Sequence, residues 1–197
     1  MTQTAPRVSD HPISPAILAR WSPRAFDDSA IDEATLLSLI EAARWAPSAY
    51  NAQPWRFVYG LRGTEVFDAL VSALLPFNAA WAEKAGALLY VLSDTLITPP
   101  GKTEPVPSGT HAFDAGAAWG YFALQATLHG LHTHAMAGFD PAKAAEVIGS
   151  GARYQIHAAV AVGRIGDPTA LPEGLRAREV PSDRRPLAEI ALHGRID

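Results

Sequence analysis

Three polar side chains stand at alternate positions near the start of the chain: Arg20, Ser22 and Arg24. Pro23 stiffens this segment, and alternate residues of an extended backbone point to the same side. Two guanidinium groups and a hydroxyl that face one way form a binding surface for a phosphate or another oxyanion. The alternative, which the spacing alone slightly favours, is a pair of solvated arginines. The segment Arg184-Arg185-Pro186 repeats the pattern near the other end of the chain, with the same alternative.

A second polar group lies between two prolines, in residues 47–54. Ser48, Asn51 and Gln53 bring a hydroxyl and two amides to this segment. Amides both donate and accept hydrogen bonds, which suits the polar edge of a heterocycle or a sugar. By itself, the segment is better explained by side chains that satisfy the loop's own backbone groups.

Three histidines, His129, His132 and His134, raise the question of a metal site. No carboxylates are interleaved with them at ligand spacing, and the chain has no cysteine, so we expect no metal. The glycine motif of Rossmann dinucleotide sites and the serine motif of α/β-hydrolases are both absent from the sequence. No catalytic carboxylate or histidine pair stands out either.

The composition is that of a globular protein. Of 197 residues, 48% are hydrophobic and 18% charged, which excludes an intrinsically disordered chain. The formal net charge of −4 gives no general attraction to nucleic acid or to anionic membranes. We find no signal peptide and no apolar run of about 18 residues, so we expect a soluble, cytoplasmic protein. We expect one domain over residues 1–197, with residues 1–15 and 190–197 as extended or flexible tails.

Helices and strands are expected to alternate without regular βαβ repetition, which predicts an α+β layer fold. We expect helices at residues 15–20, 32–46, 64–75, 79–85, 112–129 and 140–149. We expect strands at residues 55–60, 87–92, 131–136 and 156–163. Residues 94–111 contain four prolines and are expected to form a loop or lid.

The expected helix at residues 112–129 is apolar nearly all round. Phe113 and Tyr121 lie on one side, and Ala118 and Phe122 on another. Such a helix must be buried, and in a small chain a second subunit is a natural cover. We therefore favour a dimer, and the alternative is a central helix in a monomeric core.

Taken together, four segments resemble the nitroreductase superfamily of FMN-dependent oxidoreductases. Arg20-Trp21-Ser22-Pro23-Arg24, followed by Phe26, resembles the family's R-x-S-x-R/K-x-F segment, and residues 46–57 resemble its A-P-S-x-x-N-x-Q-P-W-x-F loop. Residues 136–140 resemble the stretch beside the flavin ring, and residues 184–189 the terminal R-x-P-L-x-E segment. The matches follow the family's order and span residues 20–189.

The resemblance implies a three-layer α+β fold, in which a central mixed or antiparallel sheet is flanked by helices. It also implies an intertwined homodimer with FMN at the subunit interface. By similarity, Arg20, Trp21 and Ser22 belong to the FMN site. Arg20 and Ser22 would hold the phosphate and ribityl end with Arg184, for which Arg185 is the alternative.

The remaining site residues implied by similarity lie at the ring. Arg24 would approach the N1–C2=O side, where a cation favours reduced flavin. The backbone at Ala137 and Gly138 would approach N5, and Asn78 the pyrimidine edge. The partner subunit would contribute a further set: Pro47, Ser48, Ala49, Asn51 and Asp114.

The implied reaction is two-step: NADH or NADPH reduces the flavin and leaves, and a small organic acceptor such as a nitro-aromatic, quinone or enal then takes the hydride. The flavin carries this chemistry, so no catalytic side chain is assigned. Trp81 and Ala137 stand where some relatives have a basic and an acidic residue, which weakens inference about the acceptor. The alternative is a flavin-binding protein of the same fold with a specialised role, such as a sensor or a flavin-consuming enzyme. A third reading is a metal- or anion-binding module that uses the three histidines.

Overall fold

A computed structural model describes residues 7–196 of the chain. Its helices are α1 Pro15–Ala19, α2 Glu33–Arg44, α3 Glu65–Ser72, α4 Pro76–Ala82, α5 His111–Leu128, α6 Pro141–Ile148 and α7 Glu173–Arg176. Its strands are β1 Trp55–Leu61, β2 Ala87–Asp94, β3 Leu96–Ile97, β4 Val106–Pro107, β5 His132–Met136 and β6 Tyr154–Gly163. Short 3-10 turns occupy Ala49–Asn51, Pro168–Ala170 and Leu187–Glu189.

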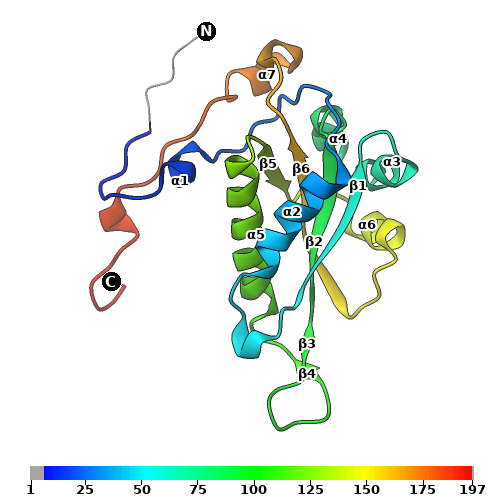
Figure 1. Ribbon diagram of the computed structural model, residues 1–197, viewed down its shortest axis with the longest axis vertical. Coiled ribbons are helices and arrows are strands. Elements are labelled where there is room, and N and C mark those ends of the chain that lie inside the picture. Colours follow the sequence, from blue (N-terminus) through cyan, green and yellow to red (C-terminus); the bar gives the residue numbers. More distant parts are fainter. Residues whose placement is uncertain (1–6, 197) are drawn as a thin grey trace.

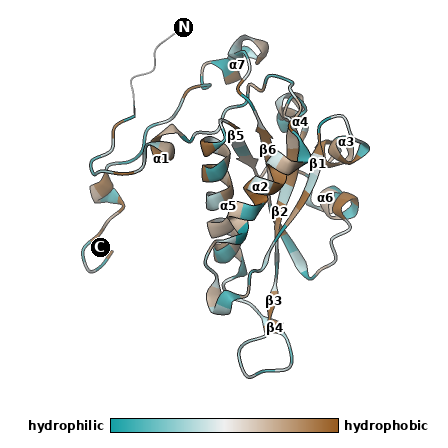
Figure 2. Ribbon diagram, viewed as in Figure 1, coloured by the Kyte–Doolittle hydropathy of each residue, from teal (hydrophilic) through white to brown (hydrophobic). Residues whose placement is uncertain are grey.

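Strand β2 is buried along its whole length, as its apolar run predicts. It lies inside a four-stranded antiparallel sheet of order β1-β2-β6-β5. Because both neighbours of β2 are strands and both of its faces are covered by helices, nearly every side chain in it must be apolar. The hydropathy colouring of Figure 2 shows these central strands among the hydrophobic parts of the chain.

Alternation along β2 divides the interior into two cores. Leu88 and Tyr90 point to the face covered by α3, α4 and α6. Leu89 and Val91 point to the opposite face, where α2 and α5 lie. The arrangement is helices, antiparallel sheet, helices (Figure 1), and it confirms the predicted three-layer α+β fold.

Local capping fixes where several helices begin and end. Asp32 accepts a hydrogen bond from the Thr35 amide at 2.7 Å and starts α2. Asp140 does the same for two amides at the start of α6, and Gly149 ends that helix in the left-handed conformation at φ 71°. These boundaries agree with the sequence prediction.

Two local predictions were wrong, and the structure contains one short helix that was not predicted. Helix α4 begins at Pro76 and ends at Ala82, whereas we expected residues 79–85; proline at the first helical position sets the start. The expected loop at 94–111 contains the short hairpin of β3 and β4. The polar C-terminal region contains α7, which is held in place by the buried side chain of Leu175.

Helix α5 has one buried face and one exposed apolar face. Phe122 and Ala126 are fully buried, whereas Phe113 is 82% and Leu128 63% exposed. The apolar sequence of this helix predicts that both faces are covered, and the exposed face has no cover within the described chain. No helix within residues 7–196 is long and apolar enough to span a membrane.

Candidate functional site

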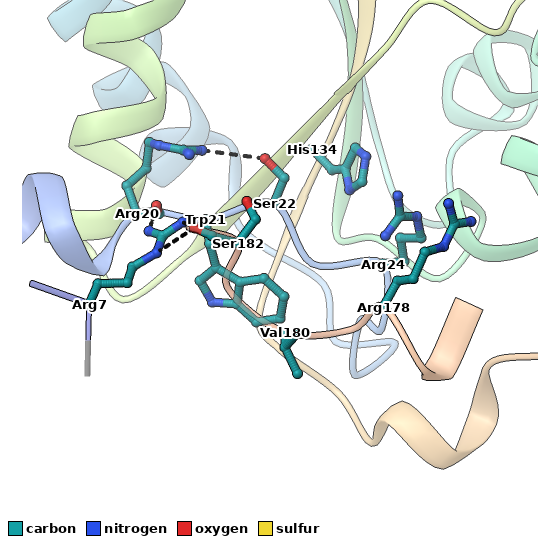
Figure 3. A pocket seen from close by; sticks show the side chains of 9 residues that line it. All are labelled: Arg7, Arg20, Trp21, Ser22, Arg24, His134, Arg178, Val180 and Ser182. Carbon is teal, nitrogen blue, oxygen red and sulfur yellow. Dashed lines mark hydrogen bonds between the residues drawn. The ribbon is translucent and has the colours of Figure 1, made fainter. Parts of the chain in front are cut away.

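A cavity of about 260 Å³ lies beside the N-terminal arginine segment (Figure 3). The segment that follows α1, strand β5 and the chain after α7 form its walls. Its lining residues are Arg7, Arg20, Trp21, Ser22, Arg24, His134, Arg178, Val180 and Ser182. Four guanidinium groups therefore face one small volume, which is an arrangement suited to an anionic ligand.

Helix α1 ends at Ala19, and the backbone of Arg20, which follows it, is extended. The Arg20 Nη1 atom donates to Ser22 Oγ at 3.3 Å. Burial lowers the pKa of Arg20, and the nearby guanidinium groups of Arg184 and Arg7 lower it further. Three cations are thus held close together, and a phosphate would relieve their repulsion.

The C-terminal chain is joined to this wall by Arg7. Its guanidinium donates to the Ser182 carbonyl at 2.8 and 3.1 Å and to the Arg20 carbonyl at 2.7 Å. Arg184 donates to the same Ser182 carbonyl at 3.1 Å. Arg184 and Arg185 are both exposed, and neither lines the cavity. Of the two candidates for the phosphate, the geometry brings Arg184 near Arg20.

Arg24 and Arg178 line the part of the cavity beyond His134 in the view of Figure 3, while Arg7 and Arg20 lie on the other side of that ring. The His134 Nδ1–H donates to the Pro23 carbonyl at 2.9 Å, and its ring packs against Trp81 at 4.7 Å between centroids. Burial lowers the pKa of His134, which keeps this ring neutral between the two groups of cations.

His129 and His132, like His134, each contact a different side chain. His132 packs edge-on against Trp21 at 6.2 Å, and burial lowers its pKa. His129 lies at the end of α5, where its ring pairs with Gln125 at 3.0 Å. Within residues 7–196, no group of three or more His, Cys, Asp or Glu side chains is placed to hold a metal ion.

Residues 137–139 form a turn that α4 supports from behind. The Gly138 carbonyl accepts hydrogen bonds from the Leu75 amide and from Asn78 Nδ2, both at 3.0 Å. A Cβ atom at Gly138 would lie 2.3 Å from that Asn78 nitrogen, so a larger residue would displace the Asn78 side chain and its hydrogen bond. Asn78 was predicted to meet the ring of the cofactor; in the structure its amide nitrogen positions the turn. Ala137 next to it is exposed.

The loop after α2 has an unusual backbone. Tyr50, Asn51 and Gln53 all have positive φ angles, between 49° and 54°. Such strain outside glycine persists only where the surrounding structure enforces it, and it is concentrated at functional sites. Ser48 Oγ accepts from the Gln53 backbone amide at 3.0 Å, and Gln53 Nε2 donates to the Asn51 carbonyl at 3.2 Å. These two side chains therefore serve the loop itself, as the alternative interpretation held. Pro47 and Asn51 are exposed.

Buried Asp114 attaches this loop to α5. Its Oδ2 accepts from the Ala49 amide at 3.3 Å and from Thr110 Oγ1 at 3.1 Å, and its side chain belongs to the first turn of the helix. The predicted grouping of Asp114 with the loop is therefore a contact within one chain.

Within one chain, the structure does not bring the loop and the arginine cavity together. Figure 1 shows α1 near the C-terminal end of α5, and the loop that follows α2 at its N-terminal end. Helix α5 has 18 residues, which corresponds to about 27 Å. The predicted site residues therefore form two separate groups on each copy of the chain.

Four lining residues were not predicted from the sequence: Arg7, Arg178, Val180 and Ser182. A fifth, His134, was considered only as a metal ligand. Arg7 and Ser182 are joined by a hydrogen bond between parts of the chain that are 175 residues apart. For Arg178 a signal was available, because Arg176 and Arg184 stand near it in the polar C-terminal segment; for Arg7 there was none.

Comparison with known proteins adds four findings. The model of the Nitroreductase family matches residues 17–75. An NADH dehydrogenase of Thermus thermophilus is 30% identical over 204 residues, which cover 90% of this chain and 93% of that protein. A crystal structure of an oxidoreductase containing FMN is 44% identical with a TM-score of 0.93 and covers 100% of this chain and 99% of its own. A nitroreductase family protein of Clostridium difficile, 21% identical with a TM-score of 0.70 over 92% of this chain and 97% of its own, shares the fold.

Proposed function

The chain belongs to the nitroreductase family, and on that premise we propose that it is an FMN-dependent oxidoreductase that takes hydride from NADH or NADPH. The acceptor we propose is a small organic molecule such as a nitro-aromatic, a quinone or an enal. The observation that carries the proposal is the cavity lined by four arginines in a chain whose net charge is −4.

The residues present fit a flavin mononucleotide. A phosphate monoester carries about two negative charges at neutral pH, and the Arg7, Arg20 and Arg184 cluster offers the matching cations. Ser22 Oγ lies 3.3 Å from Arg20 and can donate to the same phosphate. The turn at Ala137 and Gly138, which Asn78 holds in place, is the backbone that the ring would approach under this proposal.

Each residue has a binding or orienting task under this proposal. When bound, FMN supplies the hydride-transferring atom, N5, and so carries the redox chemistry. Arg20, Ser22 and Arg184 hold the phosphate, and Trp21 lies between the first two on the cavity wall. Arg24 places a positive charge at the N1–C2=O edge, which favours the reduced cofactor.

We propose that two copies of the chain complete each site. The strained loop with Pro47, Ser48, Ala49 and Asn51 lies at the far end of α5 from the arginines of its own chain. A two-fold axis across the exposed face of α5 would place that loop over the cavity of the partner, with Asp114 bracing it from behind. The exposed aromatic side chain of Phe113 supplies apolar surface for such contact.

Spectroscopy of the purified protein tests this proposal. We expect the protein to bind FMN at one site per chain and to lose the visible absorption of oxidised flavin when NADH or NADPH is added without oxygen. A set of nitro-aromatics, quinones and enals added afterwards should restore the absorption at different rates and so identify the acceptor class. A protein that stays colourless after incubation with FMN would refute the proposal. Bound flavin that neither nicotinamide reduces would favour a specialised flavin-binding role.

A further inference from the structure

A buried carboxylate, that of Glu179, lies behind the arginine segment and belongs to no part of the site described above. We propose that Glu179 is a positioning residue that fixes Arg24 and offsets part of its charge, and thereby sets how strongly the site prefers reduced over oxidised flavin. This inference rests on the proposed FMN site, and it adds to that site the residue that controls its redox end.

The first observation is how Glu179 holds the backbone. Its Oε1 atom accepts hydrogen bonds from the amides of Arg24, at 2.5 Å, and Ala25, at 2.8 Å. The Glu179 side chain is only 3% exposed. Removing a carboxylate from water is costly unless donors and a counter-charge replace the water, so this group must act as an anchor for the two amides.

The other carboxylate oxygen of Glu179, Oε2, faces the guanidinium of Arg24. Glu179 Oε2 is buried and has no hydrogen-bond partner among the described residues. It lies 3.8 Å from Arg24 Nη1, which is an ion pair without a close hydrogen bond. Arg24, 21% exposed, therefore keeps donors for a ligand in the cavity while part of its charge is balanced from behind.

Both sides of the arginine segment are held, so Arg24 has little freedom to adjust. After Arg24, the Ala25 carbonyl accepts from the Gly166 amide at 2.9 Å, and Phe26 pairs with Ile165 in an antiparallel bridge. A Cβ atom at Gly166 would lie 2.4 Å from the Phe26 carbonyl oxygen, which shows how closely the two backbones approach.

Glu179 itself is placed by the short helix α7. Its amide donates to the Arg176 carbonyl at 3.1 Å, in the turn that follows the buried side chain of Leu175. The carboxylate is therefore attached to the folded turn that follows α7.

The negative charge of Glu179 should weaken the preference of the site for reduced flavin. Reduction adds negative charge to the flavin near N1, and Arg24 attracts that charge. Glu179 opposes this attraction, and in a poorly solvated site the opposition is weakly screened. Glu179→Gln keeps an oxygen that can accept from both amides but removes the negative charge. The variant should therefore bind reduced FMN more tightly relative to oxidised FMN.

Midpoint potentials test the inference, with Glu173→Gln as a matched control because Glu173 is an exposed glutamate on α7. For Glu179→Gln we expect the affinity for reduced FMN, relative to that for oxidised FMN, to rise about tenfold. For a two-electron couple this ratio corresponds to a midpoint potential of the bound flavin about 30 mV more positive than in the wild type. Glu173→Gln should keep the wild-type potential. Glu179→Ala also loses the amide acceptor, so its affinity for oxidised FMN should fall at least about tenfold.

An unchanged potential in folded Glu179→Gln overturns the inference and leaves Glu179 a structural anchor. If that variant does not fold, Arg24→Gln provides the second test: loss of the cation should make the potential more negative, and an unchanged potential overturns the inference as well. Wild-type protein that fails to bind FMN would refute the proposed function instead, so the two failures are distinguishable.

Discussion

Replacing Arg20 with alanine removes a half-buried guanidinium from the cation cluster of the cavity. A hydrogen bond to a charged group contributes about 1.5–3 kcal/mol. The loss corresponds to roughly ten- to a hundredfold weaker FMN binding. The apo protein should not lose comparable stability, because Arg184 and Arg7 already repel Arg20 and lower its pKa.

Riboflavin, which lacks the phosphate, makes this prediction specific. Titration of apo protein should show the full loss for FMN and little loss for riboflavin, so that the difference isolates the contact between Arg20 and the phosphate. Arg44→Ala is the control, because Arg44 pairs with Glu41 on the exposed side of α2 and should change neither affinity. Equal losses for both flavins, or no loss for FMN, would show that Arg20 does not bind the phosphate.

Two further predictions concern stability. Phe122→Ala removes a fully buried ring of α5 and should lower the free energy of unfolding, measured with denaturant, by about 3–5 kcal/mol. Phe113 is 82% exposed in one chain, so Phe113→Ala should instead weaken dimer formation, measured by sedimentation. Similar losses of unfolding free energy for both variants would contradict the division of α5 into a buried and an exposed face. Burial lowers the pKa of His132, His134 and His157, so the unfolded chain binds protons that the folded chain does not as the pH falls below about 6.5. The free energy of unfolding should therefore decrease between about pH 7 and pH 5.5, and equal values at both would refute the neutral buried state of these rings.

Much of the fold could be predicted because local patterns carry it. The apolar run of β2 and the capping residues Asp32 and Asp140 each act within a few residues of the element that they define. Helix α5 marks the limit of such reasoning. Its sequence shows two apolar faces, but which of them meets the sheet depends on packing with β2 and β6, which are distant in sequence.

The candidate site divides in the same way. Arg20, Ser22 and Arg24 all line the cavity, and their closeness in the sequence made that predictable. Trp21 between them lines it too, however, and Arg24 lies on the other side of His134 from Arg20 (Figure 3). Arg7 and Glu179 had no local signal: each is a charged residue in a polar segment, and its role comes from hydrogen bonds across more than 150 residues. Tertiary contacts of this kind leave no periodicity in the sequence.

A mixed dimer tests the central claim, that FMN binds between the arginine cavity of one chain and the loop of another. Arg20→Ala disables the cavity, and Asn51→Ala disables the exposed loop amide and its left-handed backbone preference. Differently tagged chains carrying one change each can be produced together, and the heterodimer can be purified and titrated with FMN. We predict that the heterodimer regains one site of wild-type affinity, although both parent homodimers bind weakly, because one of its two sites combines an intact cavity with an intact loop. A heterodimer that binds only as weakly as its parents would contradict the shared site.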